Sequence, residues 1–270
     1  MIGNITLGQY FPGHSILHLL DPRTKILSTL MFITAIFLAE SYWSYGIIAL
    51  FTASCILISS IPVTLIARSL KPLWIIIIFT LGIHVFTTPG EVLYRYSILT
   101  ITWEGIRQGI LMTTRLVFLI VISSLLTFTT SPIVLTDGIE RLLNPFRRFG
   151  VPAHELAMMM TIALRFIPTL LEETDRIMKA QMARGAEFAS TNLLKRAQSM
   201  IPLLVPLFIS AFRRADELAT AMEARCYRGG ENRTRMKELR FATRDGGAFF
   251  VVLVLLLILG VMRWGSGILS

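Results

Sequence analysis

The sequence predicts an all-α membrane protein with about five transmembrane helices and a cytoplasmic region of long amphipathic helices. Of its 270 residues, 54% are apolar and 16% are charged, and the mean hydropathy is +0.66. A soluble domain of this length carries roughly a quarter charged residues. Long apolar segments account for most of the excess hydropathy, and the positive charges gather in the segments between them.

Four apolar segments in the N-terminal part are long enough to cross a bilayer, which takes about 20 residues. The first stretch, 26–67, holds a single charge, Glu40, beside aromatic residues that favour the membrane surface. We therefore divide it into two spans, at about 26–42 and 46–67, and place two more at about 72–90 and 108–131. A fifth span opens the C-terminal segment, 246–270.

The distribution of Lys and Arg predicts the orientation of these spans in the cell membrane. Residues 132–245 hold 18 of the 26 Lys and Arg residues, and Arg23, Lys25, Arg68 and Lys71 fall on the same side of a five-span chain. Positive charges concentrate on the cytoplasmic side of membrane proteins. We therefore expect a cytoplasmic N-terminus, an extracytoplasmic C-terminus, and three regions: a membrane part at 1–131, a cytoplasmic region at 132–245 and the last span within 246–270.

Two stretches of the cytoplasmic region leave its placement open. Residues 151–171 are apolar but contain Glu155 and Arg165, and a charge at the centre of a span costs about 2.5–3.5 kcal/mol. Residues 197–212 are short for a span and contain two prolines. We favour helices that lie at the inner membrane surface or beneath the spans. If both crossed, the topology outside them would be unchanged.

Two long helices are predicted in the cytoplasmic region, at residues 152–184 and 193–225. Apolar residues recur at three- and four-residue spacing in the first, which begins with Pro152 and stops at Gly185, a residue favoured just after a helix end. Pro168 should kink the first helix, and Pro202 and Pro206 should kink the second.

The ends of these two helices resemble each other at an offset of 41 residues, so that Ala183-Arg184 aligns with Ala224-Arg225. An arginine at a helix end could simply offset the negative end of the helix dipole, an effect of about 0.3–1 kcal/mol. Arginine also offers a rigid fork of donors that suits an acidic groove. The presence of two such helix ends in one chain favours a role in docking a partner protein. The small residues beside each arginine would allow the partner to approach the backbone closely.

No residue pattern in the chain predicts catalysis, a cofactor or a metal site. His14 and His18 have helical metal-ligand spacing, but no carboxylate or cysteine is aligned with them. The acidic cluster 172–175 has the spacing of a solvated helix face. A phosphate-binding loop of the form Gly-x4-Gly-Lys-Ser/Thr is missing from the sequence, and aromatic residues are too few among the charges for nucleic-acid binding.

At the start of the first apolar segment, Asp21 and Pro22 have the spacing of a helix cap and first-turn residue. Arg23 and Lys25 follow them, and we interpret both as anchors at the membrane surface.

The chain resembles the transmembrane (T) component of energy-coupling-factor (ECF) vitamin and metal transporters. The opening segment Pro12-Gly13-His14-Ser15 through Asp21-Pro22-Arg23-Thr24-Lys25 is similar to that of the family. Arg165-Phe166-Ile167-Pro168 leads to Ala183-Arg184-Gly185, similar to the first of two Ala-Arg-Gly-type motifs. The segment Ala224-Arg225-Cys226-Tyr227-Arg228-Gly229 is similar to the second.

The resemblance implies a non-catalytic subunit that docks two ABC-type ATPase subunits and one substrate-binding S-component. The residues it assigns to ATPase docking are Ala183, Arg184, Gly185, Ala224, Arg225 and Cys226. ATP-driven movement of the ATPases would be transmitted to the S-component for uptake of vitamins or other micronutrients. Cys226 departs from the glycine of the motif, and a positive φ is not expected there because a β-carbon disfavours it.

Two alternatives remain from the sequence. The chain could be a permease subunit of a conventional ABC importer, although a Glu-Ala-Ala…Gly coupling loop has no good copy here. The second alternative is a polytopic enzyme that acts on lipid substrates. Such an enzyme would need paired carboxylates or a nucleophile with its base.

Overall fold

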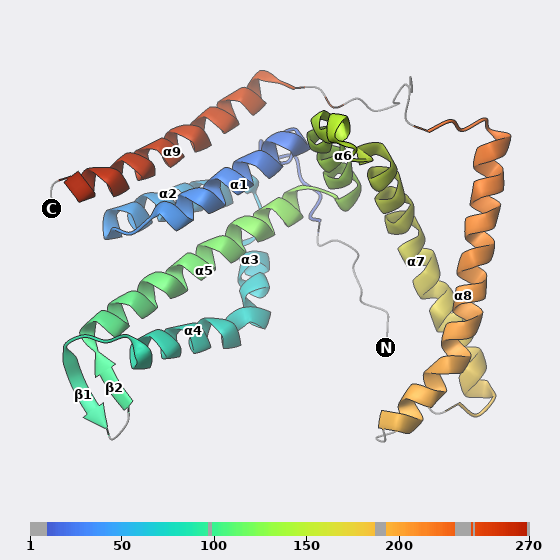
Figure 1. Ribbon diagram of the computed structural model, residues 1–270, viewed down its shortest axis with the longest axis horizontal. Helices are drawn as coiled ribbons and strands as arrows, with labels where there is room; N and C mark the ends of the chain where they lie inside the picture. The colour runs from blue at the N-terminus through green and yellow to red at the C-terminus, as the bar shows by residue number, and fades with distance from the viewer. Residues whose placement is uncertain (1–9, 97–98, 187–192, 230–238, 240, 269–270) are drawn as a thin grey trace. The chain divides into compact units, whose positions relative to one another are not determined.

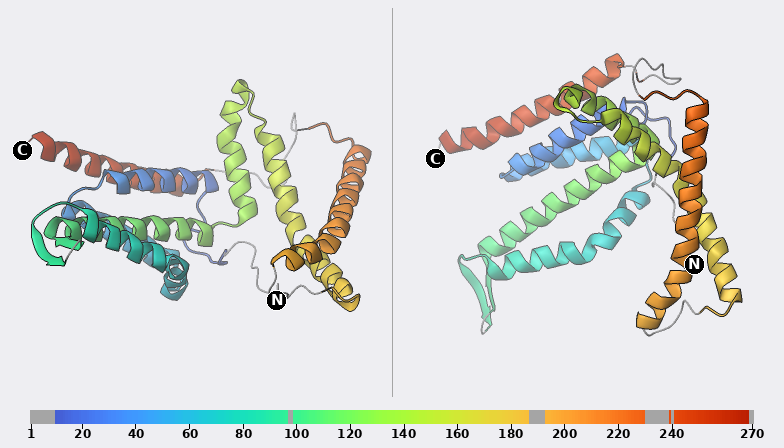
Figure 2. Two further views of the ribbon diagram at one scale, coloured as in Figure 1. Left: turned by 60° about the horizontal axis from the view of Figure 1, so that its bottom comes forward. Right: turned by 45° about the vertical axis from the view of Figure 1, so that its right-hand side comes forward.

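A computed structural model describes residues 10–96, 99–186, 193–229, 239 and 241–268. The chain divides into two compact units, one holding Gly8–Gly138 with Glu238–Ser270 and the other holding Ile139–Lys237. Figure 1 and Figure 2 show their helices and strands. The elements are α1 Pro22–Leu38, α2 Tyr42–Ser59, α3 Val63–Leu70, η1 Lys71–Leu73, α4 Trp74–Thr87, β1 Val92–Tyr96, β2 Leu99–Thr102, α5 Trp103–Thr129, α6 Pro132–Leu143, η2 Asn144–Phe149, α7 Ala153–Ala183, α8 Leu193–Ala224 and α9 Thr243–Ile268.

The structure is 81% helical, which agrees with the predicted all-α class. One departure is the antiparallel pair β1–β2, which joins α4 to α5 and which the sequence analysis did not predict. Another lies within the predicted span 46–67. There α2 ends at Ser59, Ser60 has a φ of 55°, and α3 begins after Pro62, whose missing N–H favours a helix start over continuation.

Five helical segments of the described residues are long and apolar enough to cross a membrane: Tyr42–Ser59, Val63–Thr87, Trp103–Thr129, Ala153–Ala183 and Thr243–Trp264. This set is not the predicted one. Helix α1, with 17 residues, is at the lower limit of spanning length, and α7 meets the criterion although we placed its first part beside the membrane. Length and composition do not place a helix in a bilayer, so the division into spans stays a prediction.

In the first unit, α1 packs against α9 and α5, and α5 also packs against α2, α3 and α4. The core of this unit includes Phe32, Ala35 and Ile36 of α1, which are fully buried, together with residues of α2, α5 and α9. Small residues such as Ala35 let helix backbones approach closely, which favours helix packing in membranes. Large apolar residues also remain exposed on these helices, as a lipid-facing surface requires.

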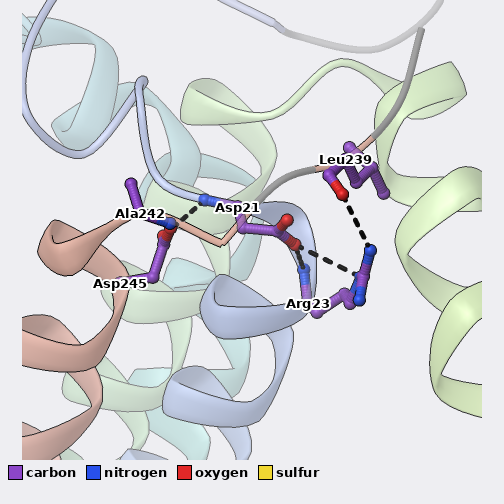
Figure 3. A network of polar contacts seen from close by, with 5 residues as sticks. All are labelled: Asp21, Arg23, Leu239, Ala242 and Asp245. Atoms are coloured by element: carbon purple, nitrogen blue, oxygen red, sulfur yellow. Dashed lines mark hydrogen bonds and ion pairs between the residues drawn. The ribbon is translucent and has the colours of Figure 1, made fainter.

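The carboxylate of Asp245 joins the N-termini of α1 and α9 (Figure 3). One of its oxygens accepts a hydrogen bond from the backbone N–H of Asp21 at 2.7 Å, and the other accepts from the N–H of Ala242 at 2.8 Å. The second bond is half of a capping box at the start of α9. Asp245 is only 3% exposed, so both bonds are shielded from water.

Asp21 and Arg23 extend this network (Figure 3). Asp21 is the cap of α1, as predicted, and its carboxylate accepts a hydrogen bond from the N–H of Arg23 at 2.9 Å. The Arg23 side chain donates to the carbonyl of Leu239 at 3.3 Å and stacks on the ring of Phe241. Arg23 therefore fixes the segment that enters α9.

Lys25 is buried, and its interpretation as a membrane-surface anchor is wrong. Its ammonium group donates to the carbonyls of His18 and Thr129, at 3.2 and 2.9 Å, and to the hydroxyl of Thr130 at 3.1 Å. Three N–H donors thus meet three acceptors, which offsets the cost of burying the charge. The bonds tie the opening segment and the start of α1 to the end of α5.

The opening segment is shaped by contacts of the His18 ring. The ring shares hydrogen bonds with the Ser15 hydroxyl at 2.6 Å and with the Phe11 carbonyl at 2.9 Å. A β-carbon on Gly13 would lie 2.9 Å from the ring, so a larger residue there would displace His18 from these contacts. Among the described residues, no group of three metal-ligating side chains occurs.

We predict that Asp245→Asn destabilises the first unit by about 1–3 kcal/mol, because an amide offers one acceptor where two buried N–H groups need partners. Thermal unfolding of the purified chain in detergent measures this loss. Asp216→Asn, at an exposed position of α8, is the matched control and should leave the unfolding temperature unchanged. Equal unfolding temperatures for the two variants would contradict the bridging role of Asp245.

Candidate functional site

The first predicted docking end closes α7, which runs from Ala153 to Ala183 as the sequence indicated. Arg184 is the cap residue, and Gly185 follows with a φ of 89°. The N–H groups of Gly185 and Ala186 donate back to the carbonyls of Met182 and Gln181, both at 3.0 Å. This pair of bonds is a Schellman motif, which requires a left-handed residue just after the cap.

The second docking end closes α8 with the same backbone hydrogen-bond pattern. Arg225 follows the last helical residue, and the N–H groups of Cys226 and Tyr227 donate to the carbonyls of Glu223 and Met222, at 2.8 and 3.0 Å. Each donor and acceptor lies 41 residues after its counterpart in α7. The repeat seen in the sequence is therefore a repeat of hydrogen-bonded geometry.

Cys226 has a φ of 55°, so our expectation of a negative φ at this position was wrong. A left-handed conformation costs a residue with a β-carbon about 1–2 kcal/mol. Two backbone hydrogen bonds that satisfy the last carbonyls of α8 offset that cost. The hydrogen bonds of the helix end, rather than the residue type, decide the conformation here.

Both arginines are exposed, together with Ala183, Gly185, Ala224 and Cys226. Neither the Arg184 nor the Arg225 guanidinium makes an ion pair or hydrogen bond with any residue that the structure describes. The six predicted docking residues thus form two separate exposed groups of three. Each group presents a free fork of donors beside small residues, a surface suited to a carboxylate-lined groove.

The two ends lie far apart, because α7 and α8 form an antiparallel pair within the second unit (Figure 1). The amide of Gln181 donates to the carbonyl of Pro202 at 3.2 Å, and the Arg214 guanidinium lies 3.8 Å from the Glu173 carboxylate. Arg184 therefore lies near the first half of α8, whereas Arg225 follows its last residue. At 1.5 Å per residue, Pro202 to Arg225 spans about 35 Å.

The contact between Gln181 and Pro202 also repairs a defect in α8. Pro206 has no N–H, so the carbonyl of Pro202 lacks its usual partner within the helix. The Gln181 side chain supplies the missing donor. This bond links the last turn of α7, directly before Arg184, to the proline-containing part of α8.

A polar network anchors the second docking end, and its contacts were not predicted from the sequence. His154 shares hydrogen bonds with the Glu140 carboxylate at 3.0 Å and with the Tyr227 hydroxyl at 3.2 Å. The same hydroxyl donates to the sulfur of Met158 at 2.9 Å. Tyr227 follows Cys226 directly, so the network holds the end of α8 against the start of α7. Tyr227 belongs to the second arginine motif, but its partners lie more than 60 residues earlier in the sequence, so no local pattern points to them.

An apolar surface of the α7–α8 pair remains exposed. It includes side chains of the Met-rich part of α7 and of the middle of α8, namely Met159, Met160, Ile201, Val205, Phe208, Ile209 and Phe212. Exposed apolar patches of this kind mark protein or membrane contacts. Methionine side chains repack easily, which suits a partner that changes position.

The apolar helices of the first unit and the exposed helix ends of the second define a helical membrane protein that contacts partner proteins. Residues 13–236 match the model of the CbiQ family, described as cobalt transport protein, and the chain belongs to this family.

Its curated relatives are named energy-coupling factor transporter transmembrane protein EcfT. The protein of Acidaminococcus fermentans is 62% identical over 265 residues, 98% of this chain and 99% of the relative. That of Clostridium kluyveri is 55% identical over 270 residues, with 98% and 100% covered. That of Bacillus subtilis is 45% identical over 264 residues, with 97% and 100% covered. The resemblance to the transmembrane component of ECF transporters is confirmed, as is a place in the membrane.

We predict that Cys226→Gly keeps the fold and leaves stability unchanged or raised by up to about 1 kcal/mol, because glycine adopts positive φ without strain. Cys226→Val should destabilise the end of α8, because a β-branched residue is an outlier in this region. Hydrogen exchange of the amides of Cys226 and Tyr227 measures both effects. Faster exchange in the glycine variant than in the valine variant would contradict the left-handed cap.

Proposed function

We propose that the chain is the transmembrane coupling subunit of an energy-coupling-factor importer. It docks two ABC-type ATPase subunits through Arg184 and Arg225 and passes their ATP-driven movement to an S-component that binds the substrate. The chain itself carries no phosphate-binding loop of the Gly-x4-Gly-Lys-Ser/Thr form, so its energy comes from these partners. The role is non-catalytic and needs no cofactor.

One observation supports this proposal above the others: the same capped arginine occurs at opposite ends of one antiparallel helix pair. A separation of about 35 Å is too large for both arginines to enter one groove, so each meets a different ATPase subunit. Because α7 and α8 pack against each other, with contacts that include Gln181–Pro202 and Glu173–Arg214, a displacement of one helix is transmitted to the other. The pair therefore couples the two ATPases mechanically.

The S-component contacts the exposed apolar surface of α7 and α8. This surface needs a partner, and its methionines tolerate the sliding that reorientation of the S-component requires. Substrate choice belongs to the S-component, so the transported micronutrient differs with the S-component that binds. Cobalt, named in the family description, is one candidate among vitamins and metals.

The subunit lies in the cell membrane with a cytoplasmic N-terminus and an extracytoplasmic C-terminus. This orientation places the two arginine ends in the cytoplasm, where ATPase subunits reside. It rests on the concentration of Lys and Arg in residues 132–245.

We predict that Arg184→Glu or Arg225→Glu each weakens the binding of one ATPase subunit by about 2–5 kcal/mol, because it removes a buried interfacial charge and adds a like charge to an acidic groove. The double variant should lose both subunits. Co-purification of tagged chain and ATPases from membranes measures the yield of each.

The control is Arg213→Glu, which makes the same charge change at an exposed position in the middle of α8. It should leave the yield of both ATPases at the wild-type level. Full co-purification with the double variant would refute the docking role. Crosslinks from positions 184 and 225 to the same groove of one subunit would refute the assignment of one arginine to each ATPase.

We predict that a reporter fused to the C-terminus is active only outside the cytoplasm. Five spans starting from a cytoplasmic N-terminus leave the C-terminus on the opposite side. An alkaline phosphatase fusion, which is active outside, and a green fluorescent protein fusion, which is fluorescent inside, measure the location together. A fluorescent, phosphatase-negative C-terminus would overturn the five-span topology.

A further inference from the structure

A cavity of about 310 Å³ lies in the first unit, between the α1–α2 turn and the first turns of α5. Its size is at the lower end of the range typical of small-molecule sites. Its lining combines apolar side chains with a set of charged and polar ones: Glu40, Tyr45, Glu104, Arg107, Gln108 and Arg115.

Arg115 is held in this cavity with part of its donor set unused. Its guanidinium donates to the carbonyl of Ala39 at 2.9 Å, which satisfies the end of α1, and it lies over the ring of Phe37. The Nε group is buried and has no hydrogen-bond partner. The enclosed Nε cannot be reached from the cavity, so only the terminal guanidinium nitrogens of Arg115 can donate to a ligand there.

Arg107 stands two helical turns before Arg115 on α5 and lines the same cavity. Its guanidinium stacks on the ring of Tyr42, 5.0 Å from the ring centre. No carboxylate or other acceptor among the described residues lies within hydrogen-bonding distance of it. Its fork of donors is therefore available to an anion.

The two carboxylates of the cavity are engaged elsewhere. Glu40 forms an ion pair with Arg263 of α9 at 2.7 Å. Glu104 accepts a hydrogen bond from the backbone N–H of Glu91 at 2.7 Å, which fixes the start of the β1–β2 hairpin. Neither carboxylate is within 4 Å of the guanidinium nitrogens of Arg107 or Arg115. The two arginines and the two carboxylates share the lining of the cavity, but neither arginine is held in an ion pair by either carboxylate.

Exposed aromatic residues surround this end of the unit. Trp43 follows Tyr42 in the first turn of α2, Trp103 precedes Glu104 on α5, and Trp264 follows Arg263 on α9. Exposed tryptophans of membrane helices lie at the level of the lipid headgroups. The cavity therefore opens at the depth where the bilayer presents its phosphates.

We propose that this cavity binds the phosphate of an anionic phospholipid headgroup. Arg107 and Arg115 donate to the phosphate oxygens, as guanidinium forks do to phosphates in general, and the amide of Gln108 offers further donors. The bound lipid joins the α1–α2 turn to α5, an effect separate from ATPase docking by the second unit. The lipid site does not depend on the proposed coupling function, and evidence against one leaves the other unaffected.

The experiment titrates the delipidated full chain in detergent with phosphatidylglycerol and follows bound lipid by native mass spectrometry and thermal unfolding. The wild-type chain should bind one phosphatidylglycerol and gain stability. Arg107→Gln should weaken binding at least about tenfold, the effect of losing one charge-assisted hydrogen bond. Because Arg107 is exposed, this variant should unfold at the wild-type temperature when lipid is omitted.

Three controls complete the test. Arg68→Gln removes the same charge at an exposed position of α3 and should bind phosphatidylglycerol like the wild type. Diacylglycerol with the same acyl chains lacks the phosphate and should not bind. Equal lipid binding by the wild type and Arg107→Gln would overturn the site. Inorganic phosphate that competes fully with the lipid would show a free-anion site and would overturn the lipid assignment.

Discussion

At the end of each long helix of the second unit, two backbone N–H groups turn back to the last carbonyls, and one residue must adopt a positive φ to allow it. Gly185 does so without strain, and Cys226 does so against the preference of its side chain. This reversal takes the chain sharply away from the helix axis directly after the arginine. The arginine is left at the tip, where none of the residues that the structure describes neutralises it, and the exposure of the candidate docking site follows from the cap.

The antiparallel pairing of α7 and α8 then sets the distance between the two tips. Gln181 joins the first tip to the proline-containing part of α8, and Tyr227 joins the second tip to His154 and, through it, to Glu140. Each arginine thus lies within three residues of a residue that contacts the other helix. A force applied at either tip reaches the partner helix through a hydrogen bond within a few residues.

The parts that the sequence predicted well depend on local signals. The bounds of α7 agree within a residue because Pro152 and Gly185 mark its two ends, and those of α8 agree because the apolar spacing continues to Ala224. The parts that it missed depend on distant partners. Lys25 resembled a surface anchor until its acceptors at the end of α5 were known, and the short hairpin β1–β2 left no pattern between its apolar neighbours.

The thiol of Cys226 has a practical consequence. The chain holds only two cysteines, and Cys55 lies on α2 in the other unit, partly buried. The exposed sulfur next to Arg225 is therefore a native attachment point for a maleimide dye or spin label, once Cys55 is replaced by serine or alanine. A probe placed there reports directly on the surroundings of the second arginine tip, with no residue added to the motif.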